Sequence, residues 1–283
     1  MRTAMRIAED KDGEILVMSV VTVPEQTPLS RGREQTDEKR EILDRAMSLA
    51  EDADVPVSGT IRISHHAASA ILNTITQYDS DAVIVGWKGR RTQRRDAVLG
   101  SNVDRIVKEA DCDVYVEKFG LEMDGRVDSI LLPTAGGPHA ALAVETAAAI
   151  ARSTRATLYP VYVLGTTPTR EEREQGESLL ATVSETVDDV PIETRLLEND
   201  DVVEALVDES ANHDLTIIGA TREGVFQKFL FGTIPETVAE RAATSVIMTK
   251  ASLELGTKLQ ESAKKLGERV TGRANPLEED ELK

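Results

Sequence analysis

Short apolar runs alternate with longer amphipathic stretches through the second part of the chain. Most of the apolar runs are continuous rather than alternating, which is typical of strands covered on both faces. Strands are predicted at 129–132, 157–164, 192–197, 215–219 and 245–249. Helical spacing predicts helices at 140–151, 168–187 and 201–212, and Gly232 opens a further helix. Strict alternation of strand and helix predicts a parallel sheet with right-handed crossovers. The ligand site of such a sheet lies beyond the carboxyl ends of its strands.

The same pattern occurs twice. The run at 81–86 reappears at 214–219, and both copies begin with Asp and end with Gly. Residues 2–21 align without gaps with 145–164, and residues 99–118 with 231–250, with identities at Gly100, Ala110, Val114 and Lys118. The sequence therefore predicts two tandem Rossmann-like α/β domains with parallel sheets, at 1–119 and 126–250.

The first copy is incomplete. Nothing in it corresponds to the strand at 129–133 or to the loop that follows, and residue 2 already aligns with the middle of the first helix of the second copy. The first domain is therefore expected to lack its first strand. We favour an N-terminal truncation, because losing a central strand leaves backbone groups unpaired. The alternative is a natural chain in which another strand fills the gap.

The last segment, 251–283, combines an amphipathic helix with a polar tail. Apolar residues recur at helical spacing, and charges of both signs cover the rest, with Leu255, Leu259, Leu266 and Val270 forming the apolar stripe. This C-terminal helix is expected to pack on the domain, on a second subunit or on a membrane partner. Its mixed charge disfavours direct lipid binding.

The net charge of the chain limits which functions are expected of it. The chain has 50 acidic and 33 basic residues, for a net charge of −17. That balance argues against nucleic-acid binding, which needs a basic footprint, and is typical of soluble proteins from halophiles. Apolar runs are too short for a membrane span, so a cytoplasmic location is expected. The single cysteine, Cys112, excludes disulfides and cysteine-rich metal sites, and no metal site is expected.

The chemistry-bearing pattern is a strand that ends in glycine, followed by a glycine–hydroxyl pair that opens a helix. A helix N-terminus offers unpaired N–H groups and a positive dipole end, and glycine lets a phosphate approach. The candidate ligand-binding residues are Gly86, Gly89, Gly100, Ser101, Gly136, Gly137, Gly219, Arg222, Gly232 and Thr233. The alternative role of Ser101 and Thr233 is helix capping without any ligand.

Two basic features lie beside these residues. The loop 88–95 is a dense basic cluster in an acidic chain, and it either clamps phosphates or is a solvated loop. Arg222 either replaces backbone donors or fills the pocket.

The chain carries no pattern of a catalytic triad or of paired carboxylates, so catalysis is not expected; weak ATP hydrolysis is the remaining alternative.

With these motifs in place, the chain resembles a tandem universal stress protein (UspA-type) over roughly residues 2–250. The resemblance implies a five-stranded parallel α/β fold and, in ATP-binding members, an Asp after the first strand and the motif Gly-x2-Gly-x9-Gly-Ser/Thr. The first copy has Gly86, Gly89, Gly100 and Ser101 with one residue too many in the longer spacing. The second copy has the right spacing, but Arg222 replaces the second Gly and Ala135 replaces the Asp.

The chain is also similar to the cytoplasmic tandem modules of haloarchaeal amino-acid transporters, through the segments around Gly86, Gly100, Gly219 and Gly232. The resemblance implies a regulatory module that binds ATP or another adenine nucleotide as a small phosphate ligand. The alternative is a nucleotide-free interaction or scaffold module that regulates a partner such as an amino-acid transporter. The two halves are expected to pack as a pseudo-dimer or to self-associate.

Overall fold

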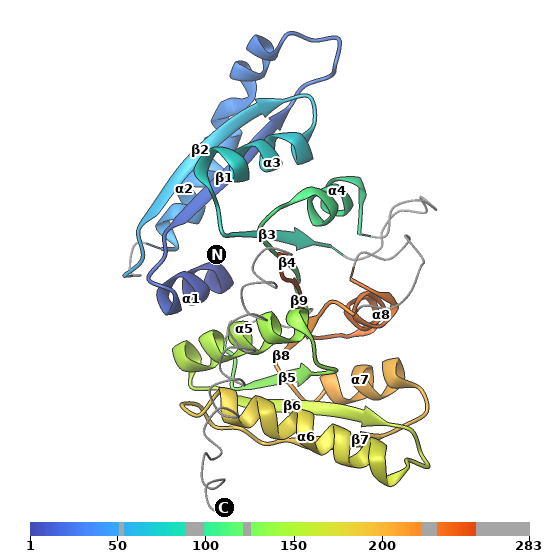
Figure 1. The fold of residues 1–283 in the computed structure, drawn as a ribbon. Coiled ribbons are helices and arrows are strands. Elements are labelled where there is room, and N and C mark those ends of the chain that lie inside the picture. The colour runs from blue at the N-terminus through green and yellow to red at the C-terminus, as the bar shows by residue number, and fades with distance from the viewer. Residues whose placement is uncertain (51–53, 89–98, 121–125, 222–230, 253–283) are drawn as a thin grey trace, which may run out of the picture.

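A computed structural model describes residues 1–50, 54–88, 99–120, 126–221 and 231–252. Its strands form a two-stranded sheet and a seven-stranded sheet, the latter in the order β3-β4-β9-β8-β5-β6-β7 (Figure 1). The strands are β1 (Ile15–Thr22), β2 (Val57–Ser64), β3 (Ala82–Trp87), β4 (Asp113–Lys118), β5 (Ser129–Pro133), β6 (Thr157–Leu164), β7 (Arg195–Glu198), β8 (Leu215–Gly219) and β9 (Ser245–Lys250). The helices are α1 (Arg2–Asp10), the short 3-10 helix η1 (Leu29–Gln35), α2 (Thr36–Ser48), α3 (Ala67–Tyr78), α4 (Ser101–Glu109), α5 (Pro138–Thr154), α6 (Arg170–Thr186), α7 (Val202–Ser210) and α8 (Thr233–Arg241).

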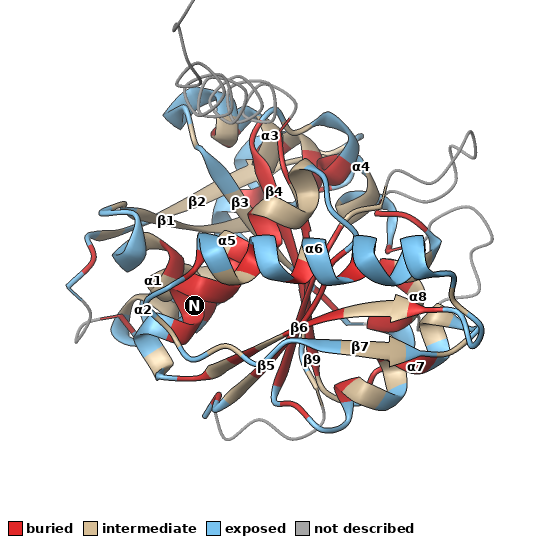
Figure 2. Cartoon of the chain, turned by 60° about the horizontal axis from the view of Figure 1, so that its bottom comes forward, coloured by how far each residue is buried: buried red, intermediate tan, exposed pale blue. Residues whose placement is uncertain are grey.

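The second half is a parallel sheet with β5 at its centre, between β6 and β8. Alternate residues of β5 enter different cores, as expected for a strand covered on both faces. Ile130 and Leu132 pack with α5, whereas Leu131 packs with residues of α7 and α8. All three side chains are fully buried. Figure 2 shows buried residues gathered along α5 and the central strands, and exposed residues along α6.

Local sequence explains where the helices begin. Pro138 starts α5, where its missing N–H costs nothing. Thr169 and Glu172 form a capping box at α6, and Asp201 caps α7 by accepting the N–H of Glu204. The third strand of this half is shorter than the predicted 192–197, because Ile192 makes only an isolated bridge to Leu158 and regular pairing begins later.

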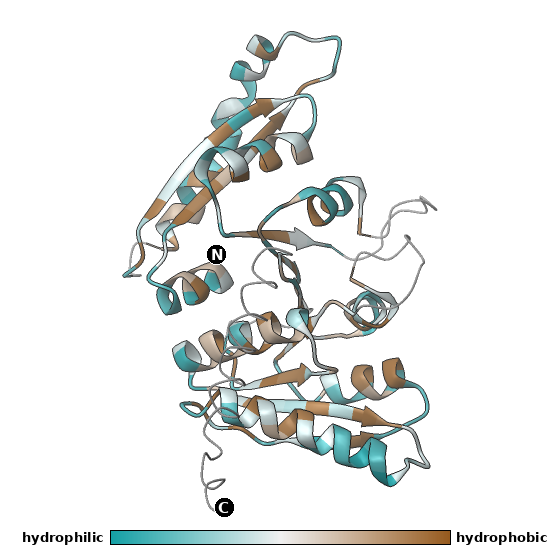
Figure 3. Ribbon diagram, in the orientation of Figure 1, coloured by the Kyte–Doolittle hydropathy of each residue, from teal (hydrophilic) through white to brown (hydrophobic). Residues whose placement is uncertain are grey.

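The first half contains four strands in the described residues, and they are split between the two sheets. β1 pairs only with β2, and β3 pairs only with β4. No described strand lies between β1 and β3, at the position that β5 occupies in the second half. The expectation that the first domain lacks its first strand is confirmed. Figure 3 shows that β1 and β3 are nevertheless apolar strands.

The two halves join through the antiparallel pair β4–β9, with Val114 opposite Lys250 and Lys118 opposite Val246. The predicted parallel sheets are thus correct within each half, but the join makes one mixed sheet. Lys118 donates to the carbonyl oxygen of Ala242 after α8, and Lys250 donates to that of Val107 in α4. These reciprocal contacts place a cation at the C-terminal end of a helix of the opposite half, where the helix dipole favours it. The halves therefore form a pseudo-dimer within one chain.

The amphipathic helix predicted near the C-terminus lies outside the described residues. Among the residues that are described, no helix combines the length and apolar character needed to cross a bilayer.

Candidate functional site

The loop after β5 brings glycines to the carboxyl edge of the second sheet. Gly136 and Gly137 have φ values of 81° and 89°, a backbone conformation that favours glycine. Gly137 is the N-cap of α5. Because Thr134 N–H is bonded to the carbonyl oxygen of Val161, the loop leaves the strand at a fixed point. The first N–H groups of α5 have no partners within the helix and face this edge.

The end of β8 lies against the start of α5. A Cβ on Gly219 would lie 2.4 Å from the carbonyl oxygen of His139 and 2.9 Å from the nitrogen of Ala140. Thr249 Oγ1 donates to that same carbonyl at 3.3 Å, and Ala220 N–H donates to the Thr249 carbonyl. Gly219 therefore permits a close helix–strand approach, in addition to lining the edge of the sheet.

The start of α8 is held by Thr221 and Glu236. Gly232 is the N-cap, with φ of 99°, and a Cβ on it would lie 2.0 Å from Thr221 Oγ1. Thr221 N–H donates to the carbonyl oxygen of Phe231 at 2.7 Å, and Glu236 accepts the Phe231 N–H at 3.0 Å. Thr233, the next residue, is exposed and makes no side-chain cap. Glycine is thus the cap residue, and the expected alternative of hydroxyl capping is not seen at α8.

These elements surround a cleft of about 550 Å³. It lies at the carboxyl ends of β5, β6 and β8, as predicted for a parallel sheet. Among the described residues that line it, none is Asp, Glu, Lys or Arg. The lining consists of Pro133, Thr134, Ala135, Gly136, Gly137, Pro138, His139, Ala140, Val161, Tyr162, Val163, Val202, Leu206, Ile218, Gly219, Ala220, Thr221 and Ile234.

The composition of the cleft indicates what it can hold. Apolar side chains from β6 and α7 provide a surface for a flat or hydrophobic group. Backbone N–H groups at the start of α5 and near the start of α8 provide donors for an anion. The start of α8 offers fewer backbone N–H donors than the start of α4, because its third residue is Pro235 and proline has no N–H. The volume is within the range of about 300–1,000 Å³ typical of small-molecule sites.

The structure brings together part of the predicted set. Gly136, Gly137 and Gly219 line the cleft, and Gly232 contacts the lining residue Thr221. Thr233 begins α8 beside this group. Arg222 lies outside the described residues.

In the first half, Gly86 lies near the carboxyl end of β3, and Gly100 and Ser101 open α4. The N–H of Leu99 donates to Asp104 at 2.9 Å, as that of Phe231 does to Glu236, so the two helix starts are built alike. Gly89 and most of the basic loop lie outside the described residues.

Several lining residues were not predicted. Ala220 and Thr221 directly follow Gly219, and Tyr162 and Val163 lie just before the last residue of β6, so the rule that ligands bind at the carboxyl ends of strands would have found them. Val202 and Leu206 reach the cleft from α7, and no local sequence signal marks that contact. His139 also lines the cleft, and its Nδ1 accepts the N–H of Ala251 at 3.1 Å.

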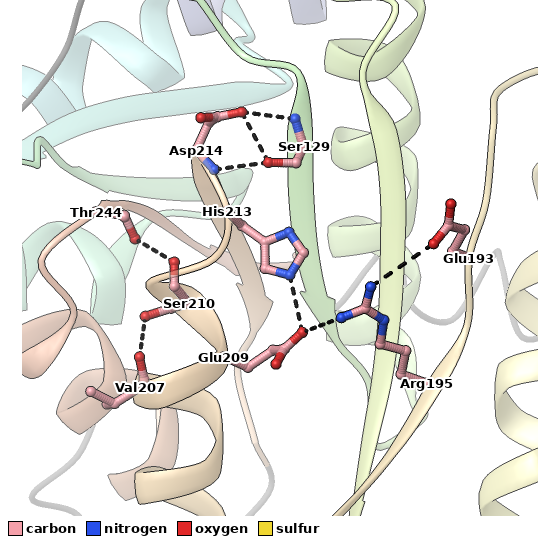
Figure 4. Close-up of polar contacts among 9 residues, drawn as sticks. All are labelled: Ser129, Glu193, Arg195, Val207, Glu209, Ser210, His213, Asp214 and Thr244. Carbon is pink, nitrogen blue, oxygen red and sulfur yellow. Dashed lines mark hydrogen bonds and ion pairs between the residues drawn. The ribbon is translucent and has the colours of Figure 1, made fainter.

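A separate polar cluster lies at the opposite, amino edge of the sheet (Figure 4). Glu209 accepts from Arg195 at 2.9 Å and lies 3.3 Å from His213 Nε2. Asp214 accepts the N–H and hydroxyl of Ser129 at 2.9 Å each, which ties the starts of β8 and β5 together. This cluster is structural.

The fold and the cleft define a tandem Rossmann-like α/β protein with a ligand-sized cleft in its second half. The model of the universal stress protein family matches residues 1–118 and 126–250. The chain therefore belongs to the universal stress protein family.

Similar proteins agree with this assignment. The chain is 25% identical over 252 residues to universal stress protein Rv2623 of Mycobacterium tuberculosis, covering 81% of this chain and 82% of the relative. It is 22% identical to the Na(+)/H(+) antiporter NhaS5 of Synechocystis, over 86% of this chain but only 35% of the antiporter's length.

Among solved structures, a universal stress protein from Archaeoglobus fulgidus aligns with a TM-score of 0.64 and 17% identity, over 89% of this chain and 92% of that one. The cytoplasmic domain of a prokaryotic cation chloride cotransporter aligns with a TM-score of 0.56 and 15% identity, over 85% of each chain. At these identities the two alignments support the fold alone.

Proposed function

We propose that the protein is a regulatory module that binds ATP or another adenine nucleotide in the cleft of its second half. The observation that carries the proposal is the cleft at the carboxyl edge, which is uncharged over its described lining residues and is closed on one side by the glycine-rich start of α5. An adenosine group would lie against the apolar residues of β6 and α7. The phosphates would meet backbone N–H groups at the starts of α5 and α8.

One residue sets the expected strength of binding. Ala135 stands where ATP-binding relatives carry an Asp, so one polar contact to the nucleoside is missing. A hydrogen bond to a charged group contributes about 1.5–3 kcal/mol, so binding is expected to be weaker than in those relatives by about tenfold or more. We infer a module that binds nucleotide reversibly and more weakly than those relatives, rather than one that holds it permanently.

Equilibrium dialysis of the full chain with labelled ATP tests the proposal. We expect saturable binding with one site in the second half. The variant Ala135→Trp, which adds a large side chain at an exposed lining position, should abolish it. The matched control is Ala181→Trp, at an exposed position on α6 outside the cleft, and it should bind as the parent does. Absence of binding above background at millimolar ATP would remove the proposal.

Ala135→Asp is the converse variant. It restores the carboxylate of the ATP-binding pattern at the end of β5, and we expect it to tighten ATP binding by about tenfold. Equal or weaker binding would show that the nucleoside does not lie beside residue 135, even if some anion binds.

The second candidate function is a nucleotide-free module that regulates a membrane transporter, such as an amino-acid transporter. The observation favouring it is the match to about one third of an antiporter, together with the cotransporter domain of similar fold. Cosedimentation with membrane vesicles that do or do not contain such a transporter distinguishes this role. Transporter-dependent sedimentation that ATP leaves unchanged would favour it over the first.

A further inference from the structure

The imidazole ring of His139 is a polar feature of the cleft besides its backbone N–H groups. His139 is the second residue of α5, directly after Pro138, so it lies in the first helical turn beside the glycine-rich loop. The residue lines the cleft. Its ring nitrogen Nδ1 accepts the N–H of Ala251, the residue that follows β9, at 3.1 Å.

The bond with Ala251 fixes which ring nitrogen carries the proton. A backbone N–H can only donate, so Nδ1 is the unprotonated nitrogen of the ring. In a neutral imidazole the proton then lies on Nε2, which becomes a hydrogen-bond donor. A second proton would have to occupy Nδ1 and would break the bond with Ala251. The fold therefore presents His139 as a neutral ring whose Nε2–H is a donor.

The main chain of His139 is held as firmly as its ring. Its carbonyl oxygen accepts the hydroxyl of Thr249 at 3.3 Å and lies against Gly219, where an added Cβ would be 2.4 Å away. Ala251, which donates to the ring, is itself buried at 3% exposure. The residue is thus fixed by β8, by β9 and by the segment after β9. A donor that is held in place before the ligand arrives loses little conformational entropy on binding.

A neutral donor beside a helix start favours an anionic oxygen. The dipole of α5 gives this end a positive potential, and the first helical turn contributes backbone N–H groups. Among the described lining residues, no Lys or Arg supplies a positive charge, and no Asp or Glu competes as an acceptor. Recognition of an anion in this part of the cleft therefore depends on uncharged donors, whose hydrogen bonds to an ionised acceptor are strong.

We propose that His139 is a specificity-determining residue of the cleft, and that its Nε2–H donates to a phosphate oxygen of the bound nucleotide. The inference rests on the proposed function, because it needs nucleotide to bind in this cleft. It gives the side chain a role that the apolar wall of β6 and α7 cannot fill, since the ring recognises the phosphate and not the nucleoside. Because Nε2 already carries a proton, it acts as a donor and not as a general base.

Two amide substitutions separate the two nitrogens of the ring. Asn places its side-chain oxygen close to the position of Nδ1, so His139→Asn keeps the acceptor for Ala251 and removes the donor. Gln is longer and places its side-chain N–H close to the position of Nε2, so His139→Gln keeps a donor and loses the acceptor. Equilibrium dialysis of the full chain with labelled ATP measures binding, and the thermal midpoint measures stability.

We expect the two variants to lose different properties. His139→Asn should weaken ATP binding about tenfold and keep the thermal midpoint of the parent, because only the donor is gone. His139→Gln should bind ATP within about threefold of the parent and unfold several degrees lower, because the bond with Ala251 is lost. Equal affinities in the two variants, or weaker binding by His139→Gln than by His139→Asn, would overturn the proposal. The ring would then act only by holding Ala251.

Adenosine shows which part of the ligand the ring contacts. We expect His139→Asn to bind labelled adenosine as the parent does, because adenosine has no phosphate. Equal weakening of ATP and adenosine binding would place the contact on the nucleoside and overturn the assignment. The control is His66→Asn, at an exposed position before α3, and it should bind both ligands as the parent does.

Nitrogen-15 NMR of the imidazole rings gives a readout that a purely structural role would not move. The His139 signals are assigned by their loss in His139→Asn. We expect the neutral Nε2–H form with and without ATP, and a shift of the Nε2–H signal when ATP is added. A signal that ATP leaves unchanged in a chain that binds ATP would overturn the inference alone. A parent that binds neither ATP nor adenosine would remove the proposed function and this inference with it.

Discussion

Gly219 in β8 lies directly against the carbonyl oxygen of His139 in α5, and a Cβ added to this glycine would lie only 2.4 Å from that oxygen. The strand and the helix therefore leave no room for a methyl group between them. We therefore expect Gly219→Ala to lower the free energy of unfolding by about 2–3 kcal/mol, as overpacking does. Urea denaturation followed by far-ultraviolet circular dichroism measures this. Because Gly86 is its counterpart with open space around it, Gly86→Ala should change stability by no more than about 0.5 kcal/mol. Equal losses at the two positions would contradict the packing described for the second half.

Gly100 and Gly232 provide a second pair, with φ values of 111° and 99°. Gly100→Ala should cost about 1 kcal/mol through backbone strain alone, because no atom of the described residues lies within 4 Å of the added methyl group. Gly232→Ala should cost about 2–3 kcal/mol, since strain is joined by the clash with Thr221. Adding Thr221→Ala should recover part of that loss. A Gly232→Ala variant as stable as Gly100→Ala, or one that Thr221→Ala does not relieve, would refute the contact.

The buried carboxyl group of Asp113 is expected to make the stability of the fold depend on pH. Its carboxylate is buried and accepts the N–H of Ser252 at 2.9 Å. Burial raises its pKa above the ordinary 3.8, Asp81 adds to this, and Lys11 and the hydrogen bond oppose it. Since the folded chain holds the proton more tightly than the unfolded chain, the contribution of Asp113 to stability falls as pH rises through its folded pKa.

Asp113→Asn keeps an acceptor oxygen for Ser252 and removes the charge. We expect this variant to be more stable than the parent at pH 7, and the difference to shrink toward about pH 4, where Asp113 is increasingly protonated. Urea denaturation at the two pH values measures it. A gain that does not change with pH would show that the carboxylate is not destabilised by its burial.

The net charge of −17 predicts stabilisation by salt. Raising KCl from 0.1 to 1 M shortens the screening length from about 10 Å to about 3 Å, which reduces repulsion among surface carboxylates. The thermal midpoint should rise over this range. A variant with three exposed carboxylates of α6 replaced, Glu171→Gln, Glu177→Gln and Glu185→Gln, should show a smaller rise. A midpoint independent of salt in both chains would contradict the argument from charge.

The sequence predicted the second half well because its signals are local. Continuous apolar runs mark β5, β6, β8 and β9, and Pro138 and Gly232 mark helix starts. The antiparallel pairing of β4 with β9 could not be predicted, because the hydrophobic pattern of an edge strand does not show which strand of the other half it pairs with. The short β7 reflects Glu193 and Thr194, two polar residues inside a run that looked like a longer strand.

The candidate site was predicted in outline only. Gly136, Gly137 and Gly219 were found because a conformational requirement or a close approach demands glycine there. Val202 and Leu206 were not found, because they reach the cleft through the packing of α7, which only the folded chain defines. The role of Glu236 was hidden for the same reason. A buried carboxylate that accepts the N–H of Phe231 looks in sequence like any helix-surface glutamate.

Hydrogen exchange of the full chain, measured by mass spectrometry with and without saturating ATP, tests whether nucleotide binds in the cleft of the second half. We expect slower exchange at the start of α5, over 137–141, and at 219–221, with little change at the amino edge around Ser129 and Asp214. Protection confined to the first half, or no protection at either cleft segment, would contradict it.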